Sequence, residues 1–153
     1  DYGHSPVEQA VELNLRIKPP LVGTRATADT VKARYMKSGF ADVYKAMLLL
    51  GDSLALTRAQ SEQMQAEEVI LVAKADTIYS ELAHRLASLP QHYDVADAVK
   101  HVNAANDQMW EAVYAEVPFI RQLLTSAQQR RLPLNLREMV TTENYKGRFY
   151  YRF

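Results

Sequence analysis

The side chains best suited to chemistry in this chain are its histidines, and their spacing does not build a reactive centre. The imidazoles are those of His4, His84, His92 and His101. None has a second histidine three or four residues away, which is the spacing that places two ligands on one helix face. The chain also has no cysteine, so thiolate zinc sites and disulfides are excluded. We therefore expect no metal site and no cofactor.

The other polar residues do not form a known catalytic pattern. The sequence has no Gly-rich phosphate loop, no Gly-x-Ser-x-Gly turn and no grouping that suggests a Ser-His-acid triad. Asp97 and His101 are four residues apart, which fits a helical ion pair. Four further acids are assigned to solvated helix faces: Asp76, Glu81, Glu111 and Glu116. The sequence predicts a protein that is not an enzyme.

A repeated motif is the strongest pattern in the chain. Leu56-Thr57-Arg58-Ala59-Gln60 returns as Leu124-Thr125-Ser126-Ala127-Gln128, 125 − 57 = 68 positions later. In each copy the threonine can accept a hydrogen bond from a backbone N–H three residues on, where a glutamine can reach back. This is the capping box of a helix start. We predict that both copies are helix caps.

These motifs resemble those of a known family. A Leu-Thr-x-x-Gln at the start of a long helix, followed by a returning helix and a second copy near its end, is similar to the Spy/CpxP-type LTxxQ proteins of the bacterial envelope. The similarity spans about residues 40–136. It implies a small all-helical periplasmic protein, either an ATP-independent chaperone or a stress sensor, and often a dimer.

Composition and charge set limits on the partners. Lys plus Arg and Asp plus Glu are both 18 in 153 residues, so no net charge draws in nucleic acid or an anionic membrane. The charges are nevertheless uneven. Residues 58–118 carry ten acids and four bases, whereas residues 119–153 carry seven bases and two acids. No apolar run approaches the ~20 residues of a membrane span, so the expected partners are proteins.

The first 39 residues are expected to form an N-terminal extension with one short helix. Residues 7–17 fit two structures, since their apolar side chains alternate as in a strand but also share a helical face. Both alternatives stay open. Thr27 or Asp29 can cap the short helix, and Gly39 can end it.

Residues 40–136 are expected to form the helical hairpin domain. From Arg58 to about Ser88 apolar residues recur at helical spacing, which predicts one helix of about 30 residues. A short enclosed helix precedes it and ends at a break over residues 51–53. Asp94 caps the returning helix after a turn. The expected core positions are Met64, Leu71, Ala75, Ile78, Leu82, Leu86 and Leu89 on the first arm, and Val95, Val99, Val102, Met109, Val113 and Val117 on the second.

Two prolines shape the end of the hairpin. Pro118 is expected to kink the returning helix, because proline removes one backbone hydrogen bond. Pro133 limits the helix after Thr125 to about two turns. The overall prediction is an all-α fold, with a long antiparallel helical hairpin, short flanking helices and extended terminal tails.

Residues 137–153 form a basic, aromatic tail. Phe149, Tyr151 and Phe153 alternate, and a terminal phenylalanine with aromatics two and four residues before it resembles the last strand of an outer-membrane β-barrel protein. The alternative is a tail that docks on its own domain. These three aromatics and the pair Trp110 and Tyr114 are the candidate protein contacts.

Two functions follow as expectations. The resemblance implies a non-catalytic, chaperone-like or stress-adaptor protein of the periplasm that binds other proteins. The alternative is a structural accessory subunit of a larger envelope complex, or a processed C-terminal piece of an outer-membrane protein. In the second case the aromatic tail would act as the anchor, since a segment of this kind can add to a partner's sheet.

Overall fold

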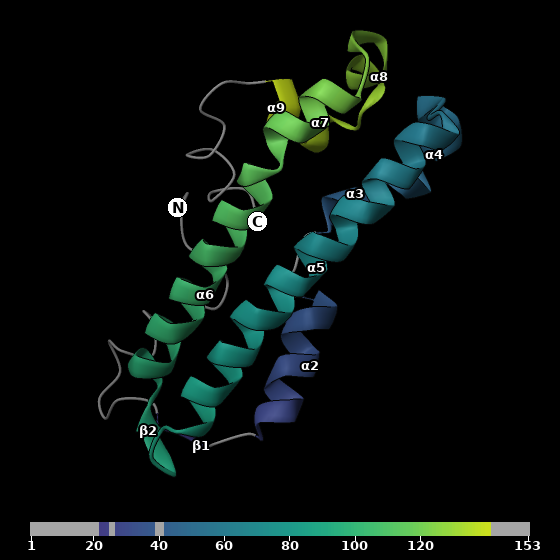
Figure 1. The fold of residues 1–153 in the computed structure, drawn as a ribbon. Coiled ribbons are helices and arrows are strands. Elements are labelled where there is room, and N and C mark those ends of the chain that lie inside the picture. The colour runs from purple at the N-terminus through teal and green to yellow at the C-terminus, as the bar shows by residue number, and fades with distance from the viewer. Residues whose placement is uncertain (1–21, 25–26, 39–41, 142–153) are drawn as a thin grey trace. The chain divides into compact units, whose positions relative to one another are not determined.

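A long antiparallel helical hairpin with short flanking helices forms the fold in the computed structural model, which describes residues 22–24, 27–38 and 42–141 (Figure 1). The arms are α5 (Arg58–Ala87) and α6 (Val95–Ala115). The all-α prediction is confirmed. Residues 7–17 and the aromatic tail, including Phe149, Tyr151 and Phe153, lie outside the described residues.

The shorter elements flank the two arms. They are β1 (Val22–Thr24), α2 (Ala28–Ser38), α3 (Val43–Leu49), α4 (Gly51–Leu54), β2 (His92–Asp94), α7 (Val117–Leu123), α8 (Ser126–Arg131) and α9 (Leu134–Thr141). The chain packs as two compact units. Unit 1 holds β1, α2, α5 from Ala75 onward, β2 and α6 as far as Met109, and unit 2 holds the other described elements and the rest of both arms. The division into an extension, a hairpin domain and a tail stays a prediction.

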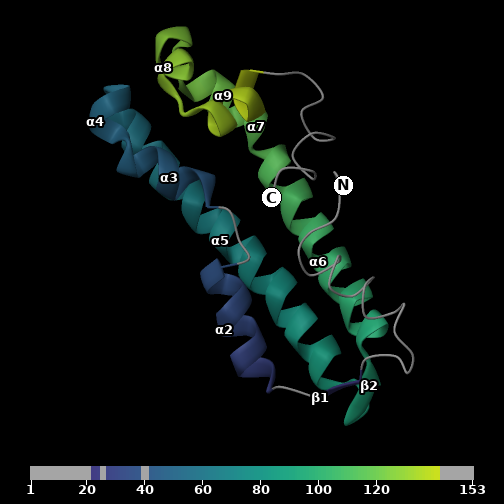
Figure 2. The ribbon, with the colours of Figure 1, turned by 180° about the vertical axis from the view of Figure 1, so that it is seen from behind.

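Unit 1 contains three packed helices and a short pair of antiparallel strands. β1 pairs with β2, with Gly23 opposite Tyr93, and both strands lie at the turn between α5 and α6 in the two views of Figures 1 and 2. Tyr35 of α2 stacks on Tyr79 of α5, with ring centroids 5.4 Å apart. Burial raises the pKa of Tyr79 to about 12, so its hydroxyl stays neutral.

Unit 2 gathers the short helices around the first half of α5. Its core contains Tyr44 and Met47 of α3, Met64 and Leu71 of α5, and Ile120 of α7, all of which are fully buried. Asp42 caps α3, because its side chain accepts a hydrogen bond from the backbone N–H of Lys45 at 2.9 Å. The carboxylate cap fixes where α3 begins.

Several expected elements are confirmed. The long helix runs from Arg58 to Ala87, and Thr27 and Asp94 each accept a hydrogen bond from a helix-start N–H. The predicted core positions that are buried are Met64, Leu71, Ala75, Leu82, Met109, Val113 and Val117. The others, Ile78, Leu86, Leu89, Val95, Val99 and Val102, are half-buried.

Other local predictions were wrong. Residues 51–53 are the start of α4, not a break, and the chain turns after it because Ala55 takes a left-handed conformation with φ 52°. Pro118 does not kink one helix. It follows the end of α6 and sits in the first turn of α7, where the missing N–H of proline costs no intrahelical hydrogen bond. The predicted turn after Pro90 contains strand β2, and α9 was not foreseen at all.

Candidate functional site

Both copies of the repeated motif are capping boxes, as predicted. The backbone N–H of Gln60 donates to Thr57 Oγ1 at 3.1 Å, and the N–H of Thr57 donates to Gln60 Oε1 at 2.9 Å. The second copy repeats this geometry, with 3.2 Å from Gln128 N to Thr125 Oγ1 and 2.9 Å from Thr125 N to Gln128 Oε1. Each motif therefore satisfies its own helix-start donors.

The structure also joins the two motifs, which the sequence did not reveal. Gln60 Nε2 donates to Gln128 Oε1 at 2.8 Å, and Gln128 Nε2 donates to Gln60 Oε1 at 2.9 Å. Each amide donates a second bond to the backbone of the opposite segment: Gln60 to the carbonyl of Leu123 at 2.8 Å, and Gln128 to that of Ala55 at 3.2 Å. We call this arrangement the glutamine bridge.

The glutamine bridge is a structural clamp. An amide offers two N–H donors and an oxygen with two lone pairs, and both glutamines use all of them. Gln128 is only 7% exposed, so these bonds are made where an unpaired amide would be costly. Of the flanking leucines, Leu124 is buried and Leu56 is half-buried. Neutral amides do not titrate, and the bridge offers no reactive group.

A second polar cluster lies in the same unit and was missed by sequence reasoning. Glu116, assigned above to a solvated face, is 6% exposed, and that assignment was wrong. The Tyr44 hydroxyl donates to Glu116 Oε2 at 2.5 Å. Burial, this hydrogen bond and the charge of Glu116 raise the pKa of Tyr44, so the hydroxyl remains a donor. The two partners are 72 residues apart, and no local pattern connects them.

Two glutamates on α5 extend this cluster. Burial, followed by the charge of Glu116 and a hydrogen bond with it, raises the pKa of the Glu67 carboxyl above its ordinary value. A hydrogen bond with Asp42, followed by burial, raises the pKa of the neighbouring Glu68. Both glutamates therefore hold their protons more tightly than an ordinary carboxyl does.

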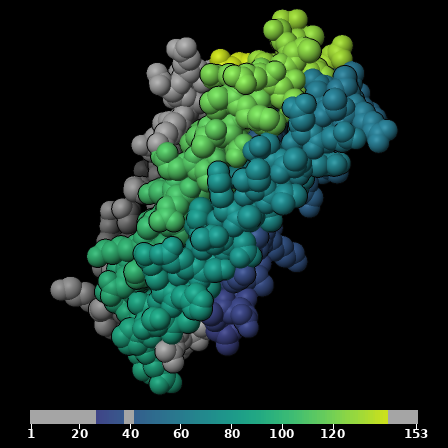
Figure 3. All heavy atoms as spheres, viewed as in Figure 1, coloured from purple at the N-terminus to yellow at the C-terminus, as the bar shows by residue number. Residues whose placement is uncertain are grey.

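An exposed apolar stripe runs along the outer side of α5 in unit 2. Val69 is 70% exposed and Ile70 is 47% exposed, and the flanking Ala66 and Ala73 are exposed too. At 100° per residue these four positions fall within an arc of about 100°. They lie opposite the buried positions Met64, Leu71 and Ala75. In Figure 3 the blue-teal atoms of this part of α5 form open surface. We call these four residues the α5 stripe.

The aromatic pair that the sequence predicted as a protein contact is less exposed to solvent than expected. Trp110 and Tyr114 are half-buried, with ring centroids 6.2 Å apart and a tilt of 39° between the rings. Their role as a protein contact stays a prediction. The stronger contact candidate is the α5 stripe, whose signal was present in the sequence as apolar residues on the side of the helix that does not face the core.

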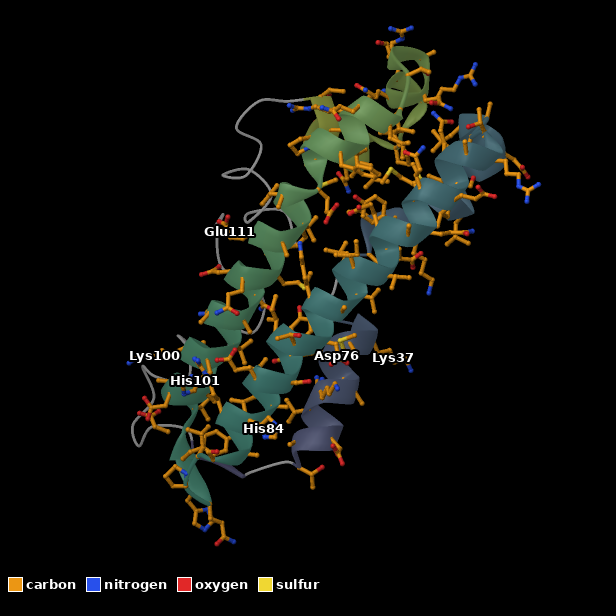
Figure 4. All side chains as sticks on the ribbon, viewed as in Figure 1. Lys37, Asp76, His84, Lys100, His101 and Glu111 are labelled. Atoms are coloured by element: carbon orange, nitrogen blue, oxygen red, sulfur yellow. The ribbon has the colours of Figure 1, made fainter. Side chains whose placement is uncertain are left out.

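Two histidines of unit 1 line one shallow hollow. His84 of α5 and His101 of α6 both line an open hollow of about 400 Å³, together with Pro90, and Figure 4 shows them on the two arms. Among residues 22–24, 27–38 and 42–141, no three His, Cys, Asp or Glu side chains are grouped so that they could hold a metal ion. The residues that line the hollow therefore do not supply a set of metal ligands.

No family model matches the chain, and comparison with curated proteins and with solved structures also found no match. Within the described part of the chain, no helix is long and apolar enough to cross a membrane.

Proposed function

We propose that this chain is a non-catalytic protein-binding module of the bacterial periplasm, similar to the LTxxQ proteins, that holds chain segments exposing apolar side chains. The observation that carries the proposal is the α5 stripe. An apolar strip on the outer side of a helix has no role in the core of its own unit, and exposed patches of this kind mark interaction sites. The resemblance carried by the repeated motif supports the periplasmic location.

The chemistry of the stripe favours an unfolded client over a single shaped partner. Its side chains are aliphatic and small, with alanines beside Val69 and Ile70, and the flanking positions are the polar Gln63 and Gln65. Such a surface offers apolar contact without directional hydrogen bonds, so it tolerates many sequences. Exposed Leu49 and Leu134 add further apolar area in the same unit.

The glutamine bridge supports this role by stiffening the start of α5. It ties the N-terminal cap of α5 to the α7–α8 junction, so the helix that carries the stripe is anchored at one end. A rigid platform loses less entropy on binding than a flexible one does. Association of two copies through the same stripe is a second consequence of this proposal, since one apolar surface can bind either a client or a second copy.

The test is suppression of aggregation by the Val69→Ser, Ile70→Ser double variant. Both side chains are exposed, so the free energy of unfolding should change by no more than about 0.5 kcal/mol each. Each loses about 1 kcal/mol or more of apolar contact with a bound client. Client affinity should therefore fall by about tenfold or more. The assay is light scattering of thermally unfolded citrate synthase with increasing amounts of the protein.

The matched control is the Gln63→Ser, Gln65→Ser double variant, which removes exposed residues of the same helix that flank the stripe. It should suppress aggregation as well as the unmodified chain does. If the unmodified chain does not slow aggregation, or if the stripe variant slows it equally well, the proposal is wrong. Analytical ultracentrifugation of the same variants reports whether the stripe also joins two copies.

A further inference from the structure

The stretch that forms α7, α8 and α9 is rich in arginine and poor in acidic residues. Residues 119–141 contain four arginines and one acid, Glu138, and they contain no lysine or histidine. A guanidinium can bind a phosphate or a carboxylate through two parallel N–H donors, whereas a lysine ammonium binds as a point charge. The residue types of this stretch therefore favour contact with oxyanions.

The packing of α9 on α8 holds three of these arginines close together. Arg137 of α9 donates from Nη1 to the backbone carbonyl of Arg130 at 3.4 Å, and Arg131 belongs to the same last turn of α8. The carbonyl groups at a helix C-terminus carry a partial negative charge, which favours cations at this position. Three positive side chains thus lie at the C-terminal end of α8.

Two of these three arginines have no acidic partner in the part of the chain that the structure describes. Arg130 and Arg131 are exposed, and neither forms an ion pair there. Arg137 uses one of its five N–H donors on the carbonyl of Arg130. The fourth arginine, Arg121, donates from Nε to the carbonyl of Val140 and so helps to hold the end of α9. Arg130 and Arg131 therefore remain available to an external anion.

An exposed leucine lies beside the arginines. Leu134 opens α9 and is 54% exposed, and it precedes Arg137 by three residues, so the two side chains are neighbours on one helix face. Leu132, in contrast, is 2% exposed and anchors the connection between α8 and α9 in the core. An apolar side chain held outward among cations is typical of a segment that docks on an anionic lipid surface.

We propose that Arg130, Arg131, Leu134 and Arg137 form a docking surface for a bilayer of anionic phospholipids. We call these four residues the arginine surface. The guanidinium groups bind the lipid phosphates, and Leu134 enters the boundary between the headgroups and the acyl chains. The association is reversible and changes no covalent bond.

The form of unit 2 favours a bilayer over an acidic peptide. α8 lies at the end of unit 2 where α5 begins, because the glutamine bridge joins the starts of these two helices (Figures 1 and 2). In Figure 3 the yellow-green atoms of this end project outward. Extended peptides are usually held in a groove or along a sheet edge. A projecting end with outward cations is better matched to the flat surface of a bilayer.

The zero net charge of the chain does not prevent this docking. At physiological ionic strength the Debye length is about 8 Å, so only the charges close to the bilayer act strongly on it. Glu138 is half-buried, and Glu62 near the start of α5 is neutralised by Arg58 at 2.9 Å. The arginine surface shares no residue with the α5 stripe. The inference therefore goes beyond the proposed function and does not rest on it.

Co-sedimentation of the full chain with lipid vesicles tests the arginine surface. The unmodified chain should bind vesicles of phosphatidylcholine and phosphatidylglycerol, release from them in high salt, and fail to bind vesicles of phosphatidylcholine alone. Each arginine near an anionic surface contributes about fivefold, so Arg130→Gln, Arg131→Gln should bind about thirtyfold more weakly. Leu134→Ser should weaken binding about fivefold or more, because a hydroxymethyl group gains little from entering the interface.

The matched control is Lys37→Gln, Lys100→Gln, which removes two exposed cations of unit 1, on α2 and α6 (Figure 4). It has the same net charge as the double arginine variant and should bind the vesicles as the unmodified chain does. Val69→Ser, Ile70→Ser should also bind them normally, which separates this surface from the α5 stripe. All these side chains are exposed, and circular dichroism verifies that each variant keeps its helices.

Three results would overturn the arginine surface. The first is equal binding to both kinds of vesicle, or to neither. The second is undiminished binding by the double arginine variant or by Leu134→Ser. The third is binding to polyglutamate in place of the anionic vesicles, which would indicate an acidic protein as the partner.

Discussion

The glutamine bridge makes a quantitative prediction about how the two halves of the repeated motif depend on each other. Gln60→Ala and Gln128→Ala each remove four hydrogen bonds, two of which are the shared amide–amide bonds. A net value of about 0.5–1 kcal/mol per bond gives a loss of about 2–4 kcal/mol for each single variant. The loss should be larger at Gln128, because it is more deeply buried than Gln60.

The double variant separates a bridge from two independent caps. Once either glutamine is absent, the other no longer has the shared bonds to lose, so the double variant should be more stable than the sum of the single effects predicts, by about 1–2 kcal/mol. The assay is urea unfolding followed by circular dichroism on the four proteins of the cycle, with Gln63→Ala as an exposed control on the same helix. Additive losses would refute the bridge and leave only two separate capping boxes.

Substitutions in and beside the two capping boxes should have smaller effects on the free energy of unfolding. Thr57→Ala and Thr125→Ala should each lower the free energy of unfolding by about 1 kcal/mol, because each leaves a helix-start N–H without its acceptor; unchanged urea midpoints for both would contradict the capping. Ala55→Gly should raise the free energy of unfolding by about 0.5 kcal/mol, since glycine adopts the left-handed conformation at φ 52° without the strain of a Cβ. A lower midpoint for this variant would show that the Cβ of Ala55 contributes more contact than strain.

Local signals in the sequence predict helix starts well in this chain and tertiary pairing poorly. The capping boxes at Thr57 and Thr125 depend on residues three positions apart, so they are visible in the sequence. The bridge between Gln60 and Gln128 depends on how the helices pack, and a repeated motif does not say whether its copies meet. Glu116 was misassigned for the same reason, because its partner Tyr44 is distant in the chain.

The two prolines show that the same residue type can stand at the end of one helix and at the start of the next. Pro133 was interpreted as the end of one helix, but its carbonyl also accepts the bond from Arg137 N at 2.8 Å that opens α9. Pro118 likewise stands in the first turn of a new helix. A proline that stops one helix is also well suited to the first turn of the next. The sequence alone does not distinguish a kink from a stop followed by a start.

The features that we connect with function all lie in unit 2. The glutamine bridge and the α5 stripe both lie there, whereas the Tyr35–Tyr79 stack and the Lys32–Asp76 ion pair of unit 1 are ordinary packing and surface contacts. The ion pair spans 3.0 Å, but its side chains are 37% and 51% exposed, so Asp76→Asn should cost no more than about 0.5 kcal/mol.

Tyr79→Ala, in contrast, empties a fully buried site and should cost about 3 kcal/mol or more. If function resides in unit 2, both unit 1 variants should retain the suppression of aggregation, measured well below their melting temperatures. Loss of this suppression in Asp76→Asn, whose fold should be intact, would show that unit 1 takes part in binding.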